Sequence, residues 1–132
     1  MKGYKDNIEK LTVANQNFRQ VLYTGKHMQL VLMSLKPGED IGLEVHNDTD
    51  QFFRIDAGQG KVVIDDNEYE VTDGDAVIVP AGAQHNVINT SESQSLSLYT
   101  IYAPAHHKDG TVHAGKSDAA ADTEHFDGMT TE

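Results

Sequence analysis

The stretch GDAVIVPAGAQHNVIN, residues 74–89, contains the features on which the prediction of the fold depends. Ala76–Val79 is a short apolar run of β-branched residues, which predicts a strand. Pro80 and Gly82 then break that strand, because proline lacks the N–H of a strand ladder and glycine accepts turn conformations. His85–Asn89 predicts a second strand. The stretch therefore indicates two strands joined by a corner, with a histidine directly after the corner.

Further short strands are predicted on both sides of this stretch, and turn residues separate them. They are Phe18–Tyr23, Gln29–Leu35, Leu43–His46, Gln51–Asp56, Gly60–Ile64, Glu68–Val71 and Leu96–Tyr102. Many short strands with almost no helical periodicity between them are typical of an antiparallel sandwich or barrel.

The two ends of the chain have a different pattern. Asn7–Ala14 predicts a short helix. After Pro104 apolar residues become rare, which predicts an extended arm with a weak helix, frayed from about Thr123. We therefore divide the chain into an N-terminal extension with a short helix (1–15), a barrel (16–104) and a partly flexible C-terminal arm (105–132).

Composition excludes several classes of function. The 132 residues fit one domain with one core. Ten Lys and Arg against 21 Asp and Glu argue against binding to nucleic acid and to anionic membrane surfaces. No apolar run approaches the roughly 20 residues of a membrane span, and no apolar export signal is recognisable, so we expect a cytoplasmic protein. There is no cysteine, which excludes a thiolate zinc site.

Four polar side chains are candidates for a metal site. Glu44 and His46 lie two apart on a predicted strand and so share one face. Gln51 opens the next strand, and His85 comes from a distant one. Imidazole suits manganese, iron, nickel and zinc, while carboxylate and amide oxygens favour the harder ions. We expect one divalent ion of this group, with coordination positions open to water or substrate.

The spacing of these residues resembles the two motifs of the cupin superfamily. The second motif is matched at every position, by Gly74, Pro80, Gly82, His85 and Asn89. The first motif keeps its spacing, but Glu44 stands in place of its first histidine and Gln51 in place of its glutamate. The resemblance covers roughly residues 18–104.

The resemblance implies an all-β fold, a cupin-type double-stranded β-barrel (jelly roll), here with the short N-terminal helix and the C-terminal arm. It also implies a metal ion held by Glu44, His46, Gln51 and His85. The wider segments resemble a subgroup described as mannose-6-phosphate-isomerase-like, and that description specifies a fold more than a reaction.

Alternatives remain open for each member of the set. The two histidines could be a buried, hydrogen-bonded pair. Glu44 is a ligand, a carboxylate that orients a histidine, or a general base. Gln51 is a ligand or a partner of the substrate.

Alternation along the strand places two more side chains near the site. Phe53 and Ile55 share the inward face with Gln51, while Arg54 points outward. We expect Phe53, Ile55 and Tyr102 to line the pocket. The histidines of the tail, His106, His107 and His113, indicate an exposed polar arm that crosses the barrel or a partner subunit, rather than a second metal site. Tyr102 and His106 could reach the mouth of the barrel if the arm folds back.

For function, we expect a metal-dependent isomerase or lyase that acts on a small oxygenated metabolite, such as a sugar or sugar acid. The metal ion would polarise a carbonyl or hydroxyl, and Glu44 would move the proton. One alternative is an iron-dependent dioxygenase, and another is a non-catalytic module that binds a metabolite or metal. We also expect a homodimer, because strand edges invite pairing. Phe18–Tyr23 and Gln29–Leu35 are the candidate contacts.

Overall fold

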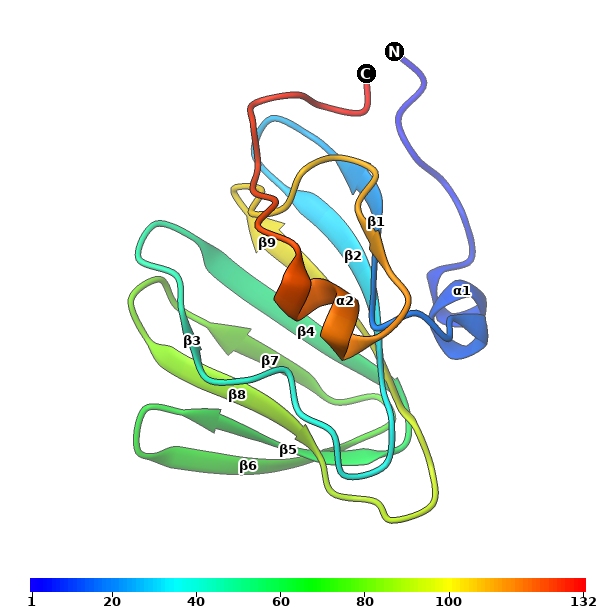
Figure 1. Cartoon of the computed structure of the whole chain (residues 1–132), viewed down its shortest axis with the longest axis vertical. Helices are drawn as coiled ribbons and strands as arrows, with labels where there is room; N and C mark the ends of the chain where they lie inside the picture. Colours follow the sequence, from blue (N-terminus) through cyan, green and yellow to red (C-terminus); the bar gives the residue numbers. More distant parts are fainter.

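Strands dominate the computed structural model, which describes residues 1–132 (Figure 1). In chain order the elements are α1 (Ile8–Ala14), β1 (Arg19–Thr24), β2 (Gln29–Leu35), β3 (Glu44–Val45), β4 (Asp50–Ala57), β5 (Gln59–Ile64), β6 (Asn67–Thr72), β7 (Ala76–Val79), β8 (Gln84–Asn89), β9 (Leu96–Ala103), β10 (Val112–His113) and α2 (Lys116–Ala121). Each predicted strand is present within one or two residues of its expected bounds. Only β10 was not predicted, because two residues carry no periodic pattern.

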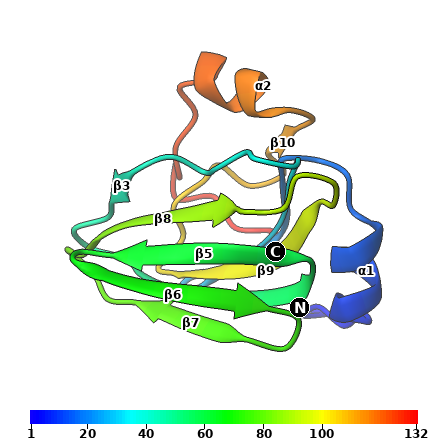
Figure 2. The same ribbon diagram turned by 90° about the horizontal axis from the view of Figure 1, so that it is seen from below.

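The strands form two antiparallel sheets that face each other (Figures 1 and 2). The larger sheet has the order β10-β1-β2-β9-β4-β7, and the smaller sheet has the order β3-β8-β5-β6. Strands that are distant in sequence lie next to each other in both sheets, which is the arrangement of a jelly roll. The predicted fold class, an all-β double-stranded barrel, is confirmed.

The hydrophobic core fills the space between the sheets. Along β4, Phe53 and Ile55 are buried at 1% and 0% exposure, and Leu98 of β9 is buried at 0%. Arg54, between the two β4 residues, is directed outward and lies 3.5 Å from Asp56. This alternation gives each strand an inner face of apolar residues, interrupted toward one end by the polar residues described below.

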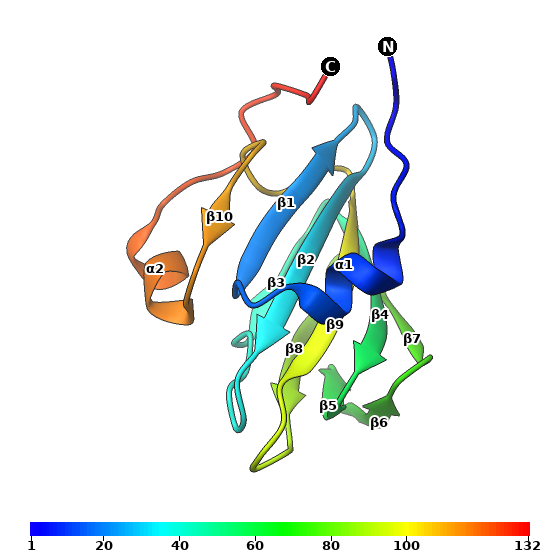
Figure 3. The same cartoon turned by 90° about the vertical axis from the view of Figure 1, so that its right-hand side faces the viewer.

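The helix α1 packs against the outer face of the larger sheet (Figure 3). Asn7 caps the helix, because its side-chain oxygen accepts a hydrogen bond from the N–H of Lys10. Thr12 is buried below the helix, and its hydroxyl donates to the carbonyl of Ile8. Neither of the two helices has the length and apolar character that a membrane crossing requires.

The C-terminal arm returns to the barrel after β9. Its strand β10 pairs with β1, and α2 lies across the space between β1 and β3 (Figures 1 and 2). Further on, the N–H of Phe126 donates to the carbonyl of His106, and the N–H of Thr131 donates to the carbonyl of Thr24. The segment after Thr123 therefore contacts the barrel, and its flexibility stays a prediction.

The sheet order corrects one prediction about assembly. The segment Gln29–Leu35 is β2, which pairs with β1 on one side and with β9 on the other. It has no free edge through which a second chain could extend the sheet. The beginning of β1 is also covered, by β10. The strands at the sheet ends are β10, β7, β3 and β6.

Candidate metal centre

Three of the four predicted ligands meet where β3 lies beside β8. Glu44 and His85 are register partners in this antiparallel pair, so their side chains project to the same side. The carbonyl of His46 accepts a hydrogen bond of 2.8 Å from the N–H of Gly82. The corner that the sequence predicted at Pro80 and Gly82 thus holds the two motifs together.

The side chains of Glu44, His46 and His85 each present one atom to a common point, and these three atoms lie within 4.8 Å of one another. His46 Nε2 is 3.1 Å from Glu44 Oε2, and His85 Nε2 is 4.0 Å from the same oxygen. The two imidazole rings have centroids 5.2 Å apart. Two imidazole nitrogens and a carboxylate oxygen in this arrangement are a donor set that divalent metal ions accept.

His85 has an unusual hydrogen-bonding state. Its Nδ1 lies 3.1 Å from the carbonyl oxygen of Ala83, and because a carbonyl only accepts, Nδ1 carries the proton. In the neutral imidazole, the form that binds a metal ion, Nε2 then holds a lone pair. This nitrogen is buried and has no hydrogen-bond partner. A histidine whose far nitrogen is fixed by a backbone carbonyl, and whose near nitrogen is free, has the form of a metal ligand.

Gln51 approaches from the opposite sheet, where it pairs with Tyr102 of β9. Its amide nitrogen donates a hydrogen bond of 3.0 Å to the hydroxyl of Thr100. The amide oxygen is buried and has no partner. Since the nitrogen is occupied by Thr100, the oxygen is the atom that remains available to a ligand.

The carboxyl group of Glu44 is charged at neutral pH. Burial raises its pKa, but the hydrogen bond and charge of His46, followed by the charges of Arg19 and His85, outweigh burial, so the net shift is downward. A carboxylate beside imidazoles supplies the negative charge that balances a divalent cation.

The three residues predicted to line the pocket, Phe53, Ile55 and Tyr102, all belong to the buried core cluster. The ring of Phe53 is 6.3 Å from that of His85, and the ring of Tyr102 is 5.9 Å from that of His46. Ile55 lies two residues further along β4 than Phe53. Burial raises the pKa of Tyr102, so its hydroxyl stays protonated.

The prediction that the tail histidines are exposed is wrong. His107 and His113 are buried at 6% and 4% exposure, and the ring of His106 lies 4.2 Å from that of His46. Burial, followed by the charges of His107 and His46, lowers the pKa of His106 to about 4. The arm therefore adds an aromatic wall of neutral imidazoles to the site. The sequence could not show this, because the contacts join residues about 60 positions apart.

The arm is held there by a second acidic residue that the sequence did not single out. Glu124 Oε1 lies 2.6 Å from His107 Nδ1, and Oε2 accepts a 2.8 Å hydrogen bond from the N–H of Lys108. Burial raises the pKa of Glu124, but these two hydrogen bonds lower it to about 2. His107 Nε2 is 3.2 Å from the hydroxyl of Tyr102, so the pair links the arm to the pocket wall.

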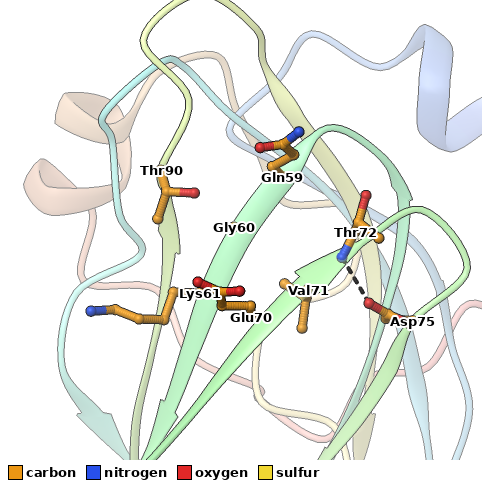
Figure 4. A pocket seen from close by; sticks show the side chains of 8 residues that line it. All are labelled: Gln59, Gly60, Lys61, Glu70, Val71, Thr72, Asp75 and Thr90. Carbon is orange, nitrogen blue, oxygen red and sulfur yellow. Dashed lines mark hydrogen bonds between the residues drawn. The ribbon is translucent and has the colours of Figure 1, made fainter.

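Two hollows differ in their relation to this site. A cavity of about 260 Å³ is lined by Glu44 together with residues of β1, α2 and the arm. A larger hollow of about 530 Å³ lies over β5 and β6 (Figure 4). Its wall has a single apolar side chain, Val71, and no histidine, and the N–H of Thr72 donates to Asp75 there. Of the candidate metal ligands, Glu44 lines the smaller cavity, and none lines the larger one.

Comparison with known proteins identifies the family. The family model of the cupin domain matches residues 31–102, more than half of the chain. The chain belongs to the cupin family. Cupins commonly bind a metal ion, and in this cupin the side chains of Glu44, His46 and His85 form the candidate site.

Several relatives are similar over most of this cupin. The uncharacterized protein YrkC of Bacillus subtilis is 49% identical over 126 residues, which cover 91% of this chain and 67% of YrkC. A crystal structure of a protein from Bacillus halodurans is 45% identical, with a TM-score of 0.89, and the match covers 92% of this chain and 96% of that one. Quercetin 2,3-dioxygenase of Bacillus subtilis is 31% identical over 78 residues, 59% of this chain and 23% of that enzyme.

Proposed function

We propose that this cupin binds one divalent metal ion through Glu44, His46 and His85, and that it is an isomerase or lyase acting on a small oxygenated metabolite such as a sugar or sugar acid. The observation that carries the proposal is the convergence of three donor atoms within 4.8 Å, one of which is the buried, unpartnered Nε2 of His85. A buried polar atom without a partner is costly, so natural proteins retain one where a ligand completes it.

Gln51 fits as a fourth ligand through its amide oxygen. That oxygen is buried without a partner, as Nε2 of His85 is. Gln51 also pairs with Tyr102, whose ring lies 5.9 Å from that of His46. The donor set then has two nitrogens and two oxygens, with a single negative charge. Manganese, iron, nickel and zinc all accept this combination of donors. The set contains no thiolate, which is the usual ligand of structural zinc sites, so it does not favour zinc over the other three ions.

The metal ion would act as a Lewis acid on an oxygen of the bound metabolite. The chain itself supplies the surroundings of that oxygen. Tyr102 and His106 form an aromatic wall, with ring centroids 5.5 Å apart, which limits the access of water. The carboxylate of Glu44 lies at the cavity wall, where it can accept a proton from a substrate. Glu44 is therefore our candidate catalytic residue as well as a candidate metal ligand.

An iron-dependent dioxygenase is the second candidate, because one relative is named a dioxygenase. The similarity to quercetin 2,3-dioxygenase is 31% over 78 residues. The three-residue set of two histidines and one carboxylate is also a set that non-haem iron uses with oxygen. Oxygen consumption by the iron-loaded protein, with no turnover of sugars under argon, would favour this candidate over the first.

Metal analysis of protein purified without chelator is the first test. We expect close to one equivalent of a single transition metal in the natural protein, and loss of that metal in the variants Glu44→Ala and His85→Ala. The matched control is His27→Ala, which removes an exposed histidine from the loop between β1 and β2. The proposal would be refuted if the natural protein is purified without metal and then takes up none of manganese, iron, nickel and zinc in calorimetry.

Turnover is tested next, with the metal-loaded protein and a panel of aldoses, ketoses and keto acids followed by NMR. Conversion that depends on metal supports the enzyme. Metabolites that raise the melting temperature without being converted would instead identify a non-catalytic binding module. For Gln51→Ala we expect weaker metal retention, and Gln59→Ala, which removes an exposed glutamine at the start of β5, is its control. Unchanged affinity in Gln51→Ala would remove Gln51 from the ligand set.

A homodimer and a cytoplasmic location complete the proposal. Support for a dimer comes from the free edges of β6 and β7, where Tyr69 and Ile78 are exposed at 49% and 67%. Large apolar side chains on an uncovered edge favour association. Sedimentation of Ile78→Lys tests this, because a charge on that edge would dissociate the dimer.

A further inference from the structure

Arg19 is a buried cation with hydrogen-bond donors that the protein does not use. The residue begins β1 and is only 6% exposed. Its guanidinium makes one hydrogen bond, at 3.2 Å, between Nη1 and His113 Nδ1. The Nε–H is buried without a partner, and no carboxylate lies within ion-pair distance of the group. The charge of Arg19 helps to lower the pKa of Glu44 and of Glu124, but neither carboxylate forms a direct ion pair with it. A buried cation without a direct partner is unfavourable, so the position points to a ligand that supplies one.

The surroundings of Arg19 hold the guanidinium in place rather than neutralise it. His113 Nε2 lies 2.9 Å from Asp122 Oδ2, so Nε2 carries the proton and Nδ1 accepts from Arg19. The guanidinium carbon also lies 5.2 Å from the ring centre of Phe18. A ring contact and an oriented imidazole fix the group, and an arginine fixed in this way loses little further entropy when it binds an anion.

Arg19 and Glu44 line the same cavity of about 260 Å³. Residues of β1, β3, α2 and the arm form its wall. Its volume is below the roughly 300–1,000 Å³ of sites that hold drug-sized ligands, so a small metabolite fits it. A molecule in the cavity can therefore contact both Arg19 and Glu44, and Glu44 is the residue of the candidate metal centre that lines it.

The remaining charged groups of the cavity have partners within the protein. Lys116 Nζ lies 2.5 Å from Asp40, Asp122 contacts His113, and Glu124 contacts His107. Glu44 faces the metal centre. Arg19 is thus the cation whose donors remain free.

We infer that the metabolite carries a carboxylate, which Arg19 binds while another oxygen of the same molecule faces Glu44 and the two histidines. This deepens the proposed function by naming its substrate class, a small hydroxy- or keto-carboxylate. The planar fork of a guanidinium matches the two oxygens of a carboxylate. A doubly charged phosphate fits less well, because Asp122 and Glu124 also line the cavity and repel the second charge.

The test compares carboxylates with their neutral amides of equal size. Binding of lactate, lactamide, pyruvate, pyruvamide and inorganic phosphate is measured by calorimetry, on chelator-treated and on manganese-loaded protein. We expect the carboxylates to bind at least tenfold more tightly than the amides. Arg19→Met should weaken carboxylate binding on the order of tenfold to a hundredfold and leave amide binding unchanged. Arg19→Lys, which keeps the charge but not the fork, should lie between the two.

Lys61→Met is the control, because it removes one positive charge from outside the cavity and should leave carboxylate binding unchanged. Equal binding of lactate and lactamide, stronger binding of phosphate than of lactate, or unchanged carboxylate binding in both folded Arg19 variants would overturn the inference. Manganese binding is measured on the same samples. Metal-free protein that selects carboxylates but takes up no metal would refute the proposed function alone. Metal uptake without carboxylate selection would refute this inference alone.

Discussion

Glu124→Gln is expected to lower the free energy of unfolding by about 2 kcal/mol, because this carboxylate ties the C-terminal arm to the barrel. Glu124 accepts one hydrogen bond from His107 at 2.6 Å and one from the N–H of Lys108 at 2.8 Å. Hydrogen bonds to charged groups contribute about 1.5–3 kcal/mol each. Glutamine keeps one acceptor oxygen and places an N–H against the second donor, so one of the two bonds is lost.

The pKa of Glu124 leads to a similar magnitude. A fall from the ordinary 4.5 to about 2 corresponds to at most about 3.4 kcal/mol of stabilisation, which solvent at the edge of the pair reduces. Since the pKa is depressed in the folded protein, this stabilisation is fully present above pH 4.5 and is lost as the pH falls toward 2. Burial also lowers the pKa of His107, so a neutral imidazole donates to the carboxylate at neutral pH.

Urea denaturation of both proteins at pH 7, 5 and 3 measures this effect. The difference between natural protein and Glu124→Gln should be the same at pH 7 and 5 and smaller at pH 3. The control is Glu68→Gln, whose side chain is 63% exposed and 3.7 Å from Lys61, and which should change stability by no more than about 0.5 kcal/mol. A difference below about 0.5 kcal/mol at pH 7 for Glu124→Gln, or one that does not change down to pH 3, would refute the reasoning.

Three further predictions concern the barrel and its metal. Gly58→Ala should destabilise the protein by about 1–3 kcal/mol more than Gly74→Ala, as measured by urea denaturation. Both glycines have positive φ, but a Cβ at Gly58 would lie 2.5 Å from the carbonyl oxygen of Ser95, whereas a Cβ at Gly74 would have no atom within 4 Å. Leu98→Ala should cost about 2–5 kcal/mol by the same assay, because the side chain is fully buried, whereas Leu43→Ala, at 63% exposure, should cost far less; equal costs would contradict the assignment of the core. Metal at a free concentration a hundred times its dissociation constant should add about 2.7 kcal/mol and raise the melting temperature, and a chelator should reverse the rise; a melting temperature that does not respond would count against a folded-state site.

Local patterns in the sequence determined most of the barrel. Period-two alternation and turn residues located nine strands, since a strand with one buried face must alternate and must end at residues that leave the ladder. The alternation also placed Gln51, Phe53 and Ile55 on the inner face of β4, where all three are buried. The cupin motifs added what alternation lacks, namely which distant strands meet, and their spacing predicts that Glu44, His46 and His85 come together.

Contacts between distant and weakly patterned segments were decided only by the tertiary structure. The sequence allowed His106 to reach the mouth of the barrel if the arm folds back, but it did not show that the arm does so, or that Glu124 binds His107. The notable omission from the sequence reasoning was Arg19. Arg19 lies two residues before buried Val21, so alternation along β1 places both side chains on the same inner face. An arginine at the end of a strand is nevertheless ordinarily solvated, and the sequence therefore offered no reason to expect its burial. Polar contacts of this kind depend on how an irregular arm folds back over the barrel, and no periodicity encodes that path. The sequence by itself therefore determined the barrel and the motif ligands, while the tertiary structure decided what surrounds them.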